Sequence, residues 1–105
     1  MTHEELFQIL KATGLPVAYS HFPEGPPSIP YITFIEIGSE NFFADDNVYK
    51  DIKDYNIELY TQYKEPNVEK VLEDLLKDHE LPFTSAETYI ESEELFQKIY
   101  EVRLI

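Results

Sequence analysis

Three histidines have the clearest capacity for chemistry, because imidazole can serve as a metal ligand or as a general acid or base. His3, His21 and His79 lie far apart in the chain, and it has no cysteine. No HxH or HxxxH spacing brings two imidazoles to one face of an element. The sequence therefore predicts no metal site, no cofactor and no histidine-based catalysis.

Aspartates in the middle of the chain could suggest calcium: Asp45, Asp46, Asp51 and Asp54. They lack the alternating oxygen ligands, the glycine and the distal glutamate of an EF-hand loop. The serines have no nucleophile-elbow context, and the three glycines form no phosphate-binding pattern. We expect a protein that is not an enzyme.

The charge balance is strongly acidic, with 21 acidic and 8 basic residues and a formal net charge of −13. Nucleic-acid binding depends on Lys and Arg clusters that release counterions from phosphates. Here Lys50 and Lys53 lie among more acids. The composition predicts a soluble acidic surface and no direct binding of DNA or RNA.

Compartment signals are few. The absence of cysteine fits a reducing compartment. The N-terminal stretch MTHEELFQIL has no basic region of the signal-peptide type, and no apolar run approaches the roughly 18 residues that cross a bilayer. We therefore expect a cytosolic protein without a membrane partner.

The length of 105 residues predicts one α+β domain over 1–105. Thr2 and Glu5 have the spacing of a capping box, and apolar residues follow at helical intervals. Gly14 is a typical C-terminal stop. These features predict a helix over residues 3–13.

The segment after this helix predicts a short strand over 17–22 and then a surface loop, PEGPPSIP. Pro26 and Pro27 stand in this loop, and prolines lack the donor that a central strand needs. A β-branched and aromatic run over 31–37, continuing past Gly38 to residue 43, predicts the next strand, and the glycine marks a bend or bulge.

A long hairpin is the simplest arrangement for the middle of the chain. Residues 44–47 are good turn formers. The strand over 48–61 follows, and its apolar residues change parity between Ile52 and Tyr55. This change predicts a bulge or twist near Lys53 and Asp54.

A second helix is predicted from one apolar face formed by Val68, Val71, Leu72, Leu75, Leu76 and His79. The opposite, solvated face holds Glu69, Lys70, Glu73, Asp74, Lys77 and Asp78. Lys70 with Asp74, and Glu73 with Lys77, are spaced to interact across one turn.

Two more strands are predicted over 83–90 and 95–104, joined by an acidic turn. The element order is then α-β-β-β-α-β-β. Such an order predicts an α+β fold in which two helices pack on one face of a mainly antiparallel sheet.

Aromatic residues make up 14 % of the chain. Phe42 and Phe43 are expected near the hairpin tip, where they cannot easily reach the core, and exposed aromatic clusters are typical of protein interfaces. Packing of these rings against the sheet edge of one subunit is the competing interpretation. The candidate interface residues are Phe42, Phe43, Asp45, Asp46, Asn47, Tyr49, Pro26 and Pro27.

Three strings carry a family resemblance: NVYKDIKDYNIELYT, the segment KEPNVEK with its helix, and ETYIESEELFQKIYEV. With the Pro-rich loop before YITF and the turn FFADDNVY, they resemble the tail-terminator (tail-completion) proteins of long-tailed phages and prophages of Gram-positive bacteria. The resemblance implies a non-enzymatic ring, usually a hexamer, that caps the tail tube and contacts the head connector. It also implies assembly in the host cytoplasm and a final location in the virion tail.

Two other functions fit the composition. An acidic DNA mimic that inhibits a nuclease or repressor would need carboxylates in uninterrupted rows, whereas lysines interleave the acids here. A head-tail adaptor that stays monomeric until assembly would act at the same junction of the phage particle as the terminator.

Overall fold

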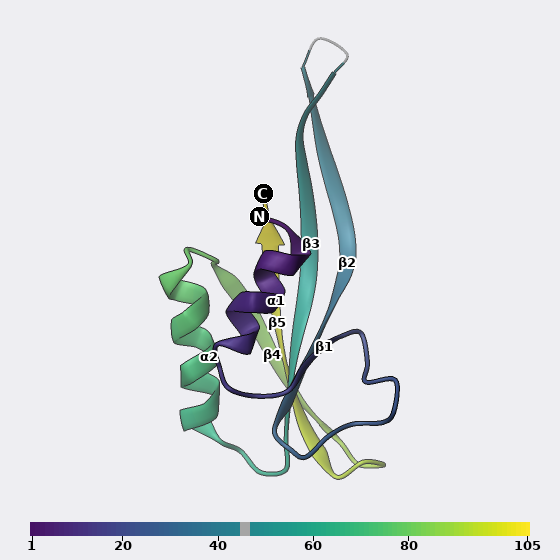
Figure 1. The fold of residues 1–105 in the computed structure, drawn as a ribbon, viewed down its shortest axis with the longest axis vertical. Coiled ribbons are helices and arrows are strands. Elements are labelled where there is room, and N and C mark those ends of the chain that lie inside the picture. The colour runs from purple at the N-terminus through teal and green to yellow at the C-terminus, as the bar shows by residue number, and fades with distance from the viewer. Residues whose placement is uncertain (45–46) are drawn as a thin grey trace.

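The computed structural model describes residues 1–44 and 47–105, and it describes side chains for 1–39 and 52–105. The elements are α1 (His3–Lys11), β1 (Val17–Tyr19), β2 (Tyr31–Ala44), β3 (Asn47–Thr61), α2 (Pro66–Asp78), β4 (Phe83–Ile90) and β5 (Leu95–Leu104). The order confirms the predicted α+β class (Figure 1).

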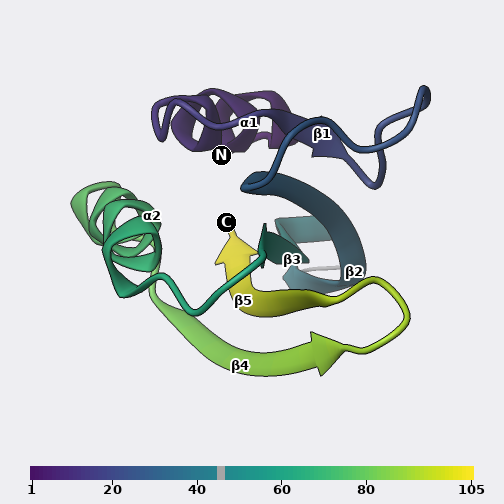
Figure 2. The ribbon, with the colours of Figure 1, turned by 90° about the horizontal axis from the view of Figure 1, so that it is seen from below.

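One five-stranded sheet has the strand order β1-β2-β3-β5-β4. Only β1 pairs in parallel, with Val17 opposite Ile32, and the other described pairs are antiparallel. Figure 2 shows the sheet as a strongly curved layer with α1 and α2 on its concave side.

The first helix begins as its sequence predicts. The Thr2 hydroxyl accepts from the Glu5 amide, and the Glu5 carboxylate accepts from the Thr2 amide, which completes the capping box. The helix ends at Lys11, two residues before the predicted end, and Gly14 follows with φ of 82°. Leu6 and Leu10 are fully buried against the sheet.

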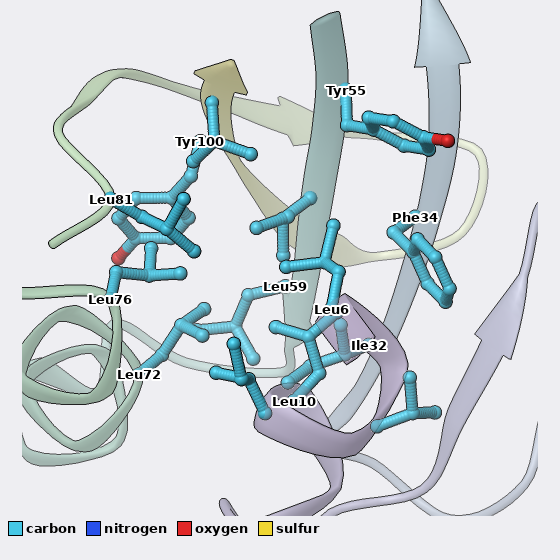
Figure 3. Packing of buried hydrophobic residues seen from close by; sticks show 14 of the residues in the cluster. Leu6, Leu10, Ile32, Phe34, Tyr55, Leu59, Leu72, Leu76, Leu81 and Tyr100 are labelled. Carbon is cyan, nitrogen blue, oxygen red and sulfur yellow. The ribbon is translucent and has the colours of Figure 1, made fainter. Parts of the chain in front are cut away.

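The core lies between the two helices and the concave face. In Figure 3, Leu72 of α2 lies near Leu59 of the central strand and Leu10 of α1, and Leu76 lies beside Leu81 and Tyr100. Burial of such apolar side chains stabilises a domain by about 1.5–3 kcal/mol each. This shared core holds both helices on one side of the sheet.

The buried face of α2 differs from the predicted one. Its fully or nearly buried residues are Glu69, Leu72 and Leu76, while Val71 is 49 % exposed and His79 is exposed. The predicted assignment of Glu69 to the solvated face is therefore wrong. The burial is possible because two lysines outside the helix pair with this carboxylate, Lys64 just before the helix and Lys98 from the distant strand β5.

Candidate functional site

The far part of the β2–β3 hairpin extends beyond the rest of the sheet as an arm, here defined as residues 39–44 and 47–52. The register of β5 on β3 reaches Leu104 opposite Lys53 and goes no further along β3. Within the described chain, the arm strands pair only with each other. Figure 1 shows the arm leaving the body along the longest molecular axis, which measures 51 Å against 27 and 22 Å for the others.

An ion pair fixes the base of the arm. Arg103 Nε donates to Asp54 Oδ1 at 2.8 Å and Arg103 Nη2 donates to Asp54 Oδ2 at 3.2 Å, joining the end of β5 to β3. The hydrogen bond from Arg103 lowers the pKa of Asp54 against the smaller, opposing effect of burial. This two-point contact is the most specific form of an Arg–carboxylate bond.

A register shift between Glu36 and Gly38 leaves Ile37 as the extra residue, opposite the step from Tyr55 to Asp54. This shift confirms the bend or bulge predicted at Gly38, whereas the irregularity predicted near Lys53 and Asp54 has its extra residue in β2 and not in β3. A second shift lies between Phe42 and Phe43. Bulges bend a strand and increase its twist, so the first shift bends β2 at the base of the arm and the second bends the hairpin within the arm.

Four of the predicted interface residues lie together in the arm. Phe42 pairs with Lys50, Phe43 with Val48, and Ala44 with Asn47, and Tyr49 lies in the same stretch of β3. Their side chains fall outside the described part, and Asp45 and Asp46 fall outside the described residues altogether. Exposure of the two phenylalanine rings stays a prediction.

The two prolines lie elsewhere. Pro26 is exposed and Pro27 is partly buried in the loop between β1 and β2, which lies away from the tip of the arm in Figure 1. The structure therefore does not bring them together with Phe42 and Phe43. Instead, Pro26 borders a hollow of about 180 Å³ that also involves Tyr31, Tyr60 and Glu93.

A network of charges joins α2 to β5. Glu69, only 6 % exposed, accepts from Lys64 Nζ and from Lys98 Nζ, each at 2.9 Å through Oε1. Burial raises the pKa of Glu69, but the hydrogen bonds from Lys64 and Lys98 outweigh this effect and hold the pKa below its usual value. Two lysines of the same chain neutralise the carboxylate, so these ion pairs hold α2 against β5.

The surface pairs of α2 are partly as predicted. Lys70 Nζ and Asp74 Oδ2 lie 2.7 Å apart, which confirms that pair. Glu73, which was paired with Lys77 by spacing, instead accepts from the Tyr100 hydroxyl at 2.7 Å. The contact of Glu73 with Tyr100 on β5 therefore replaces the predicted contact with Lys77 along the helix.

Within residues 1–44 and 47–105, no group of three or more His, Cys, Asp or Glu residues could hold a metal ion. No helix in that part of the chain is long and apolar enough to span a bilayer.

Comparison with known proteins adds no assignment: no protein-family model matches the chain, and no curated protein matches it.

Proposed function

We propose that this chain is a structural subunit of a phage or prophage tail that caps the tail tube as a ring and joins it to the head connector. The projecting β2–β3 arm is the observation that carries the proposal. The resemblance of NVYKDIKDYNIELYT and ETYIESEELFQKIYEV to tail-terminator proteins supplies the biological setting.

The arm suits contact between subunits. A two-stranded ribbon alone is only marginally stable in water, so packing against another chain would stabilise it. Its strands also offer unpaired backbone groups along their outer edges. In a closed ring, one surface of a subunit meets a different surface of the next one. An arm that leaves the body on one side provides such an asymmetric contact.

The acidic composition supports the same function. With a net charge of −13, a ring would repel DNA and let it pass without adhesion. The ion pairs of α2 argue against a DNA mimic, because Lys70 and Lys98 neutralise part of the acidic helix surface. A mimic requires uncompensated carboxylates spaced like phosphates.

Electron microscopy of tails tests the proposal. Particles assembled without this protein should carry overlong tails that fail to join heads, and adding the purified protein should restore joining. Light scattering coupled to size-exclusion chromatography, at high concentration or with purified tail tubes, should detect a closed ring of the 12.4 kDa subunit. Tails of normal length and normal head attachment in the absence of the protein would contradict it.

A further inference from the structure

A hollow on the side of the sheet away from the helices combines aromatic walls with an acidic group. It lies where the β1–β2 loop approaches the β4–β5 turn, and its lining includes Phe22, Pro26, Tyr31, Tyr60 and Glu93. The volume of about 180 Å³ is sufficient for one side-chain head group and too small for a large ligand.

The aromatic walls are held in a fixed arrangement. The rings of Tyr31 and Tyr60, which lie opposite each other on β2 and β3, are stacked with centroids 4.8 Å apart and planes 17° apart. The ring of Phe22 packs edge-on against that of Tyr31, with the two ring centroids 5.5 Å apart. Gln97 Nε2 donates to the Tyr60 hydroxyl at 2.9 Å. These contacts preorganise the hollow before any ligand enters.

The charge of the hollow comes from Glu93 in the β4–β5 turn. Within the described part of the chain, its carboxylate has no hydrogen bond or ion pair, whereas the nearby Glu58 accepts from Thr33 at 2.8 Å. Burial, then the neighbouring Tyr60 and Glu93, raise the pKa of Tyr31, so the Glu93 charge is felt at this ring. Both phenols remain neutral hydrogen-bonding groups at physiological pH.

We propose that this hollow receives the guanidinium group of an arginine side chain from a basic partner protein. A planar guanidinium packs against aromatic rings and forms charge-assisted hydrogen bonds with a carboxylate, and the lining of the hollow contains aromatic rings and the Glu93 carboxylate. Lysine fits less well because its compact ammonium cannot stack in the same way.

A second copy of the chain is a poor source of this arginine. The sequence contains a single arginine, Arg103, and it is engaged with Asp54 by two hydrogen bonds. The chain as a whole carries 21 acidic against 8 basic residues, which favours a partner of opposite charge. This inference is independent of the tail function, since it requires only the hollow and the charge of the chain.

NMR titration with N-acetylarginine amide tests the proposal, and N-acetylcitrulline amide is the control because it has nearly the same shape without the charge. At tens of millimolar, the arginine probe should shift the amide signals of Tyr31, Tyr60 and Glu93 in a saturable manner. The citrulline probe should bind at least several-fold more weakly.

Glu93→Gln should weaken binding of the arginine probe about threefold to tenfold by removing the charge. Glu91→Gln, in the same exposed turn but outside this hollow, should leave the affinity unchanged. Unaltered signals in the core would show that both variants are folded. Equal responses to the two probes, or an arginine response unaffected by Glu93→Gln, would overturn the proposal.

Discussion

The hydroxyl of Tyr100, at the centre of β5, donates a 2.7 Å hydrogen bond to the carboxylate of Glu73 on α2. Tyr100 is fully buried, so this bond lets a polar group lie within the core without losing its partner. Burial, followed by the hydrogen bond to Glu73 and its charge, raises the pKa of Tyr100. The phenol therefore stays protonated and keeps donating.

Tyr100→Phe should lower the free energy of unfolding by about 1.5–3 kcal/mol, the usual contribution of a hydrogen bond to a charged group. Urea unfolding at neutral pH measures this change. Tyr63→Phe is a matched control, because Tyr63 is 69 % exposed and its substitution should change stability by less than about 0.5 kcal/mol. Similar effects of the two substitutions would contradict the role assigned to Tyr100.

Stability should fall in acid because of Glu69. Its pKa is held below the ordinary 4.5 in the folded chain, against the effect of burial, by Lys64 and Lys98. A carboxyl group with a depressed folded pKa contributes stability that is fully present above its unfolded pKa. That contribution disappears as pH falls through the folded value. The Glu69 contribution should therefore decline below about pH 4.5.

Glu69→Gln isolates this effect from that of other acids. The variant should be less stable than the parent at pH 7, and the difference between the two should shrink as pH is lowered toward 3. Glu91→Gln provides an exposed control whose difference from the parent should stay small throughout. Urea melts at several pH values give these differences, and a constant effect of Glu69→Gln across the range would refute the linkage.

Leu72→Ala should cost about 2–5 kcal/mol of unfolding free energy, because Leu72 is 1 % exposed within the core between helices and sheet. Val71→Ala, one residue earlier and 49 % exposed, should cost far less. Chemical denaturation of both variants compares a buried and an exposed position of the same helix. A loss well below 1 kcal/mol for Leu72→Ala would rule out the packing described above.

Local sequence patterns predicted most of the fold. Both C-terminal strands have the predicted bounds, since their β-branched and aromatic runs end at clear turn residues. The strand predicted over 17–22 ends earlier, at Tyr19, where Ser20 adopts φ of 67°. Its parallel pairing with β2 depends on tertiary packing, which no local pattern encodes.

The position of Phe42 and Phe43 in the arm followed from the local turn pattern, but the hollow was harder to predict because it depends on strand register. Tyr31 and Tyr60 become neighbours only through the pairing of β2 with β3, and Glu93 joins them through the β4–β5 turn. Glu69 presents the same difficulty, since Lys98 reaches it from a distant strand. The proline content predicted the loop that borders the hollow, but it did not predict which residues of other elements lie beside that loop.

Phe42 and Phe43 lie in the arm, where β2 pairs with β3 beyond the end of β5. If their rings anchor a neighbouring subunit or a tail tube, replacing both with serine should abolish association while leaving the thermal melt nearly unchanged. Light scattering and tube co-sedimentation measure association, and circular dichroism measures the melt. Tyr63→Ser, at an exposed position of the body, is the control and should preserve association. A large drop in melting temperature for the double variant would instead place the rings in the core of the subunit, because cavities in a packed interior destabilise the whole domain.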